Sequence, residues 1–460
     1  MKLLAIDDAL WGLHWYLSKA YEYPGVHKKL RDLKEEGVLK KPEWQNLQIK
    51  RLRRLLRFAQ HKVPYYRELF KSVQFNPETA NLPNELQQLP ILTKDIIKNH
   101  LEDILAVTVN KTDTFENTTG GSTGVPLRFY QDLEYQTIAE AIDTYVREWW
   151  GIKPYNRTAL IWGADQEFYE LSLKERLYKM RQRTKSLNAF RMTEESLLEF
   201  CQILARWRPP YLMGYASALE SLAKCAMDNR IDGLNFTAIR STAEMLFPEQ
   251  RELIEEVLNG PVFNFYGSRE VSNIAAECPE EKRLHLISTW RYVEIVDDKG
   301  FWMPDGESGS IAITDLSNYA MPFIRYLNED MACMAIGPCP CGRPSPVIDE
   351  LLGRRTDIIR TARGDIIHGE YFTHLFYGRN DIRQFQVHQT DLNHLVIRYV
   401  PINKPPEEYI KNVVKKILER LGDEVKVKVE LCDRIPLLSS GKFRFTISDV
   451  TGENLQNVKK

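Results

Sequence analysis

The segment from Thr118 to Gly124 is rich in glycine and in hydroxyl side chains, a combination that suits phosphate binding. Glycine lets the backbone approach a ligand closely, and backbone amides and hydroxyls donate hydrogen bonds to phosphate oxygens. No lysine follows the last glycine, so the segment is not a P-loop of the GxxxxGK[ST] type. An ordinary turn or linker is the alternative interpretation. The residues that we expect to bind phosphate are Thr118, Thr119, Gly120, Gly121, Ser122, Thr123 and Gly124.

A second polar segment, from Tyr266 to Glu270, directly follows a buried strand predicted at 262–266. Proteins that alternate strands with helices bind ligands at the carboxyl ends of such strands. The ring of Tyr266 could stack on a nucleotide base, and the carboxylate of Glu270 could bind Mg²⁺. A tight turn after a core strand is the alternative interpretation.

A single lysine near the end of the chain, Lys442, follows Gly441 in a turn rich in serine and glycine. A lone lysine in such a turn is commonly a solvated charge. Lys442 is of interest because the segment from Thr118 to Gly124 has no lysine of its own. A cation delivered by a second domain could stabilise the charge that develops on a phosphoryl or carboxyl oxygen.

Cysteine and histidine side chains are concentrated between residues 278 and 341. Cys278, His285, Cys339 and Cys341 form a C-x₆-H … C-x-C arrangement, and Cys333 lies nearby in the sequence. Zn²⁺ prefers four sulfur or nitrogen ligands in tetrahedral geometry, with thiolates from reduced cysteines. Small buried thiols beside a surface histidine are the alternative. No obvious base accompanies the set, so we predict a structural zinc.

The composition is that of an ordinary globular protein, with 43% hydrophobic and 27% charged residues. A formal net charge of -1 gives no reason to expect binding to nucleic acid. The apolar run from Met1 to Ile6 is too short for a signal peptide, and no stretch approaches the ~20 apolar residues that cross a bilayer. With seven sparse cysteines, we expect a cytoplasmic protein with reduced thiols.

Hydrophobic spacing predicts a helical leader to about residue 70, followed by a mixed α/β pattern. The dipeptide Val63-Pro64 is expected to end the helix of the leader. We predict a long helix at 133–150 and strands at 126–131, 158–163, 262–266, 291–296 and 310–314. Strands that alternate with helices favour a layered α/β architecture. A chain of 460 residues exceeds what one hydrophobic core usually organises, so two or more domains are expected.

A smaller α+β unit is predicted after Gly353. Its strands are expected at 384–388, 394–400 and 425–431, with a helix that begins near Pro405 and ends before Gly422. This string of about 100 residues is long enough to fold by itself. We therefore predict a large domain over 1–352, with the zinc-bearing segment at 278–341, and a small C-terminal domain over 353–460.

Taken together, these segments resemble the motifs of the adenylate-forming ligases, and within them the phenylacetate–CoA ligase-like and capsular polysaccharide CapK-like branch. Each motif is short, but several motifs in the same order make a specific signal, which runs from about residue 45 to 446. The segments that carry it are VPYYR at 63–67, LPILTK at 89–94, TTGGSTG at 118–124, YGSRE at 266–270, MPFIRY at 321–326 with Asp330, GRRTD at 353–357, and GK at 441–442.

The resemblance implies a large α/β domain with layered sheets and helices, and a small, mobile α+β C-terminal domain. The small domain would turn about a hinge at Thr356 and Asp357. Lys442 would bridge to the forming acyl-adenylate as a catalytic residue. Some members of this branch carry a Cys/His set like the one described above, and a homodimer is compatible with the resemblance.

The resemblance also assigns the nucleotide contacts. Ser122, Thr123 and their neighbours would hold the phosphates of ATP. Tyr266 would stack on adenine, and Glu270 would bind Mg²⁺ as a second catalytic residue. The remaining nucleotide-binding residues that it implies are Gly267, Ser268, Arg269, Asp330 and Arg354, of which Asp330 and Arg354 would bind ribose.

The implied activity is ATP-dependent activation of a carboxylic acid through an acyl-adenylate, followed by transfer to the thiol of CoA. One alternative is transfer of the acyl group to an amine, as in polysaccharide or secondary-metabolite synthesis. Another is a non-catalytic nucleotide-binding protein. Three departures from the family pattern stand out. Ser268-Arg269 replaces the hydroxyl-bearing residue often found just before the glutamate, Asn328-Glu329-Asp330 lacks the glycine usually next to the ribose aspartate, and residues 1 to about 40 have no counterpart.

Overall fold

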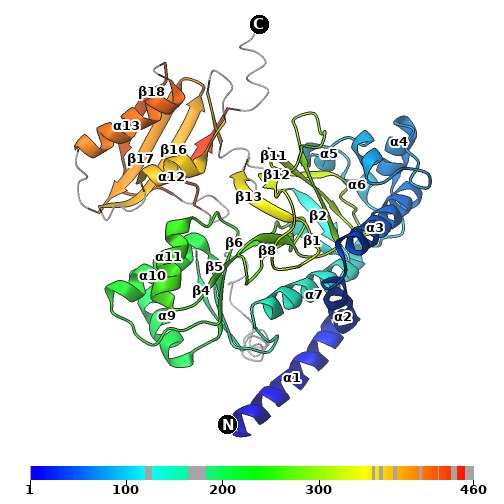
Figure 1. Cartoon of the computed structure of the whole chain (residues 1–460), viewed down its shortest axis with the longest axis horizontal. Helices are drawn as coiled ribbons and strands as arrows, with labels where there is room; N and C mark the ends of the chain where they lie inside the picture. Colours follow the sequence, from blue (N-terminus) through cyan, green and yellow to red (C-terminus); the bar gives the residue numbers. More distant parts are fainter. Residues whose placement is uncertain are drawn as a thin grey trace. The chain divides into compact units, whose positions relative to one another are not determined.

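The computed structural model describes residues 2–119, 127–163, 183–189, 191–354, 358–361, 366–376, 381–402, 407–422, 424–436 and 443–450. The chain divides into two compact units (Figure 1). The larger comprises Met1–Asn328 and Ala332–Glu350, and the smaller comprises Glu329–Met331 and Leu351–Lys460. A large α/β unit and a smaller α+β unit are the fold class that the sequence predicted.

The larger unit begins with the helices that the sequence predicted for its leader. These are α1 (Lys2–Glu22), α2 (Val26–Glu36), α3 (Lys41–Lys62) and α4 (Pro64–Ser72). Val63 has extended backbone with φ −118° and ψ 110°, as a residue before proline prefers, so α3 ends there and Pro64 starts α4. Short helices follow at η1 (Asn84–Gln88), α5 (Lys94–Asn99), α6 (Leu101–Ile104) and η2 (Lys111–Asp113).

An eleven-stranded sheet organises the larger unit. In spatial order its strands are β10 (Arg291–Val296), β11 (Ser308–Asp315), β12 (Tyr326–Met334), β13 (Val347–Arg354), β9 (Leu284–Leu286), β8 (Ala275–Glu277), β7 (Val262–Tyr266), β6 (Ala238–Thr242), β5 (Tyr211–Tyr215), β3 (Thr158–Trp162) and β4 (Thr184–Asn188). From β4 to β7 the pairs are parallel, whereas β7, β8, β9 and β13 pair antiparallel. A separate hairpin pairs β1 (Phe115–Thr118) with β2 (Arg128–Gln131).

Helices cover both faces of the parallel strands (Figure 1). Alternate residues of a strand point to opposite faces. Leu212 and Ile239 pack in one apolar cluster with α9 (Glu194–Trp207), α10 (Ala216–Asp228) and α11 (Pro248–Leu258). Their neighbours Tyr211 and Ala238 pack in another cluster with α2 and α7 (Leu133–Trp149). Burial on both faces explains why β3 and β5 are mainly apolar, whereas β6 also buries Arg240, Ser241 and Thr242.

In its described residues, the smaller unit contains a four-stranded sheet and two helices. The sheet runs in the order β18 (Lys426–Leu431), β17 (His394–Pro401), β16 (Ile382–Asp391) and β19 (Thr446–Ser448). Val413, Ile417 and Leu421 of α13 (Glu407–Leu421) pack against this sheet, and the helix ends directly before Gly422, as predicted. The sequence missed β19, the pair β14 (Ile358–Arg360) and β15 (Ile366–His368), and α12 (Gly369–Phe376).

The strands predicted in the larger unit are confirmed. Those at 262–266 and 291–296 match β7 and β10 residue for residue. The other three overlap β2, β3 and β11, and the predicted long helix is α7. Among the described residues, no helix combines the length and hydropathy that a membrane crossing requires.

Candidate functional site

A short turn follows β7, the last strand of the parallel run. The Ser268 hydroxyl accepts a hydrogen bond from the Val271 backbone amide at 3.0 Å, and the Ser268 amide donates to the Val271 carbonyl at 3.2 Å. A Cβ atom on Gly267 would lie 3.1 Å from the Asn273 amide nitrogen, so glycine relieves a close approach there. The predicted nucleotide-binding residue Ser268 therefore closes the turn, while Arg269 is exposed to solvent.

The carboxylate at the end of this turn is buried and oriented. Glu270 is 8% exposed, and its Oε1 accepts a hydrogen bond from the Tyr326 hydroxyl at 2.8 Å. Tyr326 is fully buried at the start of β12. A carboxylate has acceptor capacity for about four hydrogen bonds or metal contacts, so one bond from Tyr326 fixes the rotamer and leaves capacity for a cation.

The predicted adenine-stacking ring is held by the same strand. Asn328 Nδ2 donates a hydrogen bond to the Tyr266 hydroxyl at 2.5 Å. Tyr326 and Asn328 are two residues apart on β12, so both side chains leave the strand on one face. One face of β12 therefore holds both ends of the segment from Tyr266 to Glu270.

The hairpin of β1 and β2 contains the described part of the predicted phosphate segment. The Thr119 amide donates to the Leu127 carbonyl at 2.9 Å, and the Thr119 hydroxyl accepts from the Leu127 amide at 3.1 Å. Thr118 pairs with Arg128 across the hairpin. Thr119 thus closes the base of the loop. The predicted residues Gly120, Gly121, Ser122, Thr123, Gly124, Thr356, Asp357 and Lys442 lie outside the described residues.

A side chain of β2 links this hairpin to the turn after β7. Gln131 Nε2 donates to the Glu270 backbone carbonyl at 3.3 Å, and Gln131 Oε1 accepts from Asn117 Nδ2 at 2.8 Å. Gln131 itself is 2% exposed. Gln131 pairs with Phe115, at the end of the hairpin away from residues 119 and 127, so β2 is joined to the turn after β7 at that end.

The predicted ribose contacts, Asp330 and Arg354, both belong to the smaller unit. Arg354 Nε lies 4.0 Å from Asp330 Oδ1. Between Asn328 and Asp330, Glu329 has φ +69°, in the left-handed region that favours glycine. Glu329 thus adopts a backbone conformation for which glycine is the usual choice.

The segment before β12 is anchored by a buried ion pair. Arg325 Nε lies 3.1 Å from Glu294 Oε1, and each side chain is 1% exposed. Arg325 also donates to the carbonyls of Leu89 at 2.5 Å and Gly300 at 2.6 Å. The Leu92 amide donates to the Arg325 carbonyl at 3.0 Å. The segments 89–94 and 321–326 thus position β12, which in turn holds Glu270.

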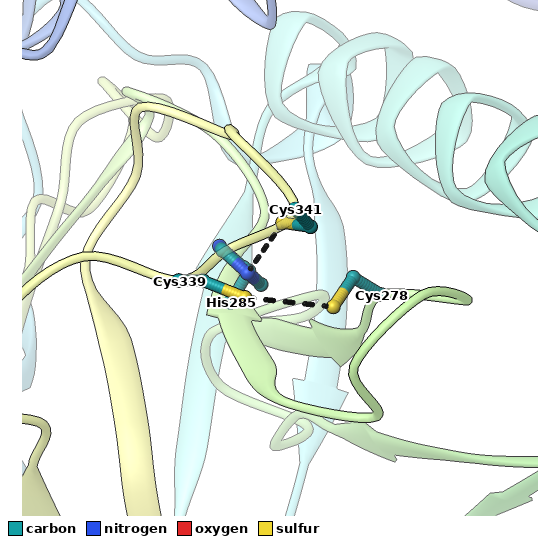
Figure 2. Close-up of side chains that lie close together, drawn as sticks. All are labelled: Cys278, His285, Cys339 and Cys341. Atoms are coloured by element: carbon teal, nitrogen blue, oxygen red, sulfur yellow. Dashed lines mark hydrogen bonds between the residues drawn. The ribbon is translucent and has the colours of Figure 1, made fainter.

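The four predicted zinc ligands come together in the larger unit (Figure 2). Cys278 follows β8, His285 lies in β9, and Cys339 and Cys341 lie in the loop before β13. Their ligand atoms all lie within 4.8 Å of one another. The Cys278 and Cys339 sulfurs are 4.0 Å apart, and Cys341 Sγ is 3.3 Å from His285 Nε2. Zinc–sulfur bonds of about 2.3 Å in a tetrahedron place ligand atoms about 3.8 Å apart, so the set fits zinc.

The surroundings of this Cys/His cluster are compatible with a bound metal ion. His285 Nδ1 lies 3.2 Å from the Ser345 hydroxyl, which leaves Nε2 directed at the sulfurs. Burial lowers the pKa of His285 to about 4, so the imidazole is neutral at pH 7, as a ligand must be. Burial raises the pKa of Cys341 to about 12, so its thiol stays protonated at pH 7 unless a cation binds beside it. Cys333 is not part of the cluster.

Sequence reasoning missed Tyr326, Asn328 and Ser345. Tyr326 and Asn328 precede Asp330 by four and two residues, so their alternation along a strand was the available signal. Ser345 carried no signal, because a serine four residues after a cysteine does not belong to any metal-binding sequence motif.

The chain is similar to several known proteins. Residues 359–449 match the model of the CapK C-terminal domain. Protein CapK of Staphylococcus aureus is 24% identical over 415 residues, which cover 88% of this chain and 89% of CapK. A phenylacetate-coenzyme A ligase of Thermus thermophilus is 24% identical over 342 residues, covering 71% of this chain and 73% of the ligase.

A solved 2-hydroxyisobutyryl-CoA ligase, in the postadenylation state in complex with R3-HIB-AMP, superposes with a TM-score of 0.72. It is 19% identical, with 93% of each chain covered, and it shows the shared fold. This chain is thus similar to CapK and to phenylacetate-coenzyme A ligases over most of its length. The resemblance expected from the motifs is thereby confirmed.

Proposed function

We propose that this chain activates a carboxylic acid with ATP through an acyl-adenylate and then transfers the acyl group to the thiol of CoA. The observation that carries the proposal is the segment from Tyr266 to Glu270 at the end of β7, held by Tyr326 and Asn328 of β12. The similarity to phenylacetate-coenzyme A ligases along most of the chain supports the same activity.

In the first half-reaction, a carboxylate oxygen of the acid attacks the α-phosphorus of ATP. A new P–O bond forms, the bond to the β-phosphate breaks, and pyrophosphate leaves. The obstacle is repulsion between two anions, so catalysis depends on positioning and on positive charge. The product is a mixed anhydride whose AMP group is a good leaving group.

The residues of the larger unit would position the nucleotide. Asn328 restrains the ring of Tyr266, on which adenine would stack. Tyr326 orients the carboxylate of Glu270, which would hold Mg²⁺ and so offset the negative charge of the phosphates. The hydroxyls and amides from Thr118 to Gly124 would hold the phosphate oxygens.

The second half-reaction needs a different set of groups at the carbonyl. The CoA sulfur attacks the acyl carbon, the C–O bond to AMP breaks, and the thiol proton is lost to solvent or a base. We propose that Lys442 serves the adenylation step, that Asp330 and Arg354 bind ribose, and that 353–460 turns about Thr356 and Asp357 between the two steps. The paired positions of Asp330 and Arg354 support their shared role.

The Cys/His cluster completes the proposal as a structural zinc centre. Cys278, His285, Cys339 and Cys341 would hold the ion, which would cross-link the β8–β9 hairpin to the loop before β13. Four protein ligands leave no open position for a substrate, so the centre is expected to support the fold and not the chemistry.

Pyrophosphate exchange into ATP tests the first half-reaction. The purified chain would be assayed with a panel of aryl and short-chain acids, with the Lys442→Ala variant as control. We expect exchange with at least one acid, and its loss in the variant. ATP binding without exchange for any acid would instead favour a non-catalytic nucleotide-binding protein.

An amine is the competing acceptor for the acyl group. The same adenylate reacts with an amine, and the similarity to CapK extends over more of the chain than the similarity to the phenylacetate-coenzyme A ligase. Once an acid is found, AMP release would be followed with CoA alone, with an amine panel alone, and with neither. CoA-dependent release supports the thioester, and amine-dependent release without CoA supports the amide.

A further inference from the structure

The first helix of the chain exposes a row of large apolar side chains. On α1, Leu10 is 62% exposed, Leu13 57%, Leu17 59% and Tyr21 89%. Steps of three, four and four residues keep these side chains on one face of a helix. We call Leu10, Leu13, Leu17 and Tyr21 the α1 stripe. Solvated helices normally carry polar residues at such positions, so the exposed row requires an explanation.

The opposite side of α1 is fixed to the larger unit. Trp15 packs against the apolar cluster of α2 and α7, and Lys19 Nζ lies 3.1 Å from Glu140 Oε1. The Trp11 ring lies 4.9 Å from the Arg183 guanidinium. A Cβ atom on Gly12 would lie 3.2 Å from the ring of Tyr155, so the helix approaches closely there. Because these contacts use the other face, the α1 stripe points outward.

A helix with apolar residues on both faces is typical of one that is covered on both faces. One face of α1 packs against the rest of the larger unit. The spacing of the stripe indicates that another helix packs on the second face, because 10, 13 and 17 follow the three–four alternation of helices that pack against each other. In the sequence the same alternation continues back through Leu3 and Ile6.

The charges on α1 argue against a lipid surface as the second cover. Helices that lie on anionic membranes carry lysine and arginine along the edges of their apolar face. The other exposed residues between 9 and 21 are Ala9, His14 and Tyr16, and none of them is a lysine or arginine. Lys19 faces the larger unit, where it pairs with Glu140. An apolar face without fixed charge can meet a copy of itself without repulsion.

We propose that the α1 stripe pairs with the α1 stripe of a second copy of this chain. The four side chains expose on the order of 500 Å² of apolar surface, so two copies would bury about 1,000 Å², the lower limit for a specific interface. Contacts from the flanking Ala9, His14 and Tyr16 would add to this area. The expected product is a two-fold dimer, since self-complementary surfaces close in pairs.

The test is the mass of the full-length chain in solution by light scattering, between about 1 and 100 µM, the range in which small interfaces dissociate. The wild type is expected to approach the mass of two chains as its concentration rises. The triple variant Leu10→Glu, Leu13→Glu, Leu17→Glu is expected to raise the dimer dissociation constant at least about a hundredfold. The matched control replaces three exposed apolar residues elsewhere, Val38→Glu, Val107→Glu and Met227→Glu, and should dimerise like the wild type.

Two further measurements keep the proposal open to refutation. All six replaced side chains are more than half exposed, so thermal melting should be unchanged, and a folded monomeric triple variant supports the proposal. Leu13→Cys with a thiol cross-linker should give a covalent dimer that added Leu10→Glu and Leu17→Glu abolish. A monomeric wild type, a dimer that survives the triple variant, or stripe-dependent binding to phosphatidylglycerol vesicles by a monomer would each overturn it.

Discussion

The two candidate centres of the larger unit are built in opposite ways. The Glu270 region joins three distant parts of the chain, 115–131, 266–270 and 326–328, and each functional side chain is held by a hydrogen bond from another element. The Cys/His cluster uses only the β8–β9 hairpin and one loop, and its four ligand atoms already lie within 4.8 Å of one another.

Because of this difference, we expect substitutions in the Glu270 region to affect ligand binding and substitutions in the Cys/His cluster to affect the stability of the fold. The Glu270 region orients groups toward a ligand that comes from outside, so losing one group should reduce catalysis and leave the fold intact. The Cys/His cluster is complete from its own residues, so losing one ligand should reduce the free energy of unfolding. Four substitutions test this contrast.

The largest effect is expected for Glu270→Gln. The substitution keeps the shape and the bond from Tyr326 but removes the charge that would hold Mg²⁺, so pyrophosphate exchange should fall by about 10²–10³-fold. The half-saturating Mg²⁺ concentration should rise, while the melting temperature should stay within about one degree.

The control for that variant is Glu281→Gln, which changes an exposed carboxylate in the same unit. It should exchange at the wild-type rate. If Glu270→Gln kept full exchange at limiting Mg²⁺, Glu270 would have no role in holding the cation.

Cys339→Ser should reduce the stability of the chain and leave nucleotide binding unchanged. Loss of one thiolate ligand should release the zinc, measured by mass spectrometry of the metal, and lower stability by about 2–3 kcal/mol. The KM for ATP should stay within about twofold, since the cluster makes no contact with the Glu270 region in the described residues.

Cys333→Ser is the matched control, since Cys333 lies near the cluster in sequence but outside it in space. It should keep one equivalent of zinc. Wild-type protein with less than a tenth of an equivalent of zinc would refute the centre altogether.

Tyr326→Phe should have an intermediate effect. Without the hydroxyl, Glu270 loses the donor at 2.8 Å, and its rotamer is no longer fixed. We expect exchange to fall about tenfold, the equivalent of ~1.4 kcal/mol, with a larger loss at low Mg²⁺ than at saturating Mg²⁺. A loss that is independent of Mg²⁺ would point to a role for Tyr326 in packing alone.

The smallest effect is expected for Glu329→Gly. At φ +69° a glycine has no steric cost, so the substitution should stabilise the chain by no more than about 1 kcal/mol in a denaturant titration. Glu329→Ala keeps the strain and serves as the reference. If Glu329→Gly were destabilising relative to Glu329→Ala, the left-handed backbone at this position would be wrong.

Much of this architecture could be predicted because the strands of the larger unit are marked by composition. β7 is a buried strand at the end of the parallel run and β10 is an antiparallel edge strand, and both are rich in apolar and β-branched residues, so both were predicted to the residue. The Cys/His cluster was predictable for a different reason. Cysteine and histidine are uncommon in sequences but common as zinc ligands. Cys278 and Cys339 could therefore be associated although 61 residues separate them.

The positioning residues could not be predicted in the same way. Tyr326 and Asn328 act through partners that only the sheet order brings near, and their residue types are common in any strand. In the smaller unit, β14, β15 and β19 span three residues each, too short for a periodic pattern to show. Pairing across long sequence separations leaves no local signature.

The place of β13 in the sheet has a consequence for synthesis of the chain on the ribosome. β13 pairs with β9, with Val347 opposite His285, so β9 has an unpaired edge until β13 has been translated. Exposed edges recruit other strands, which makes such an intermediate prone to aggregation. Cys339 and Cys341 emerge immediately before β13. Capture of a metal by the loop would therefore bring the closing strand to the edge that needs it, and zinc supply during expression should determine how much of the protein is recovered in native form.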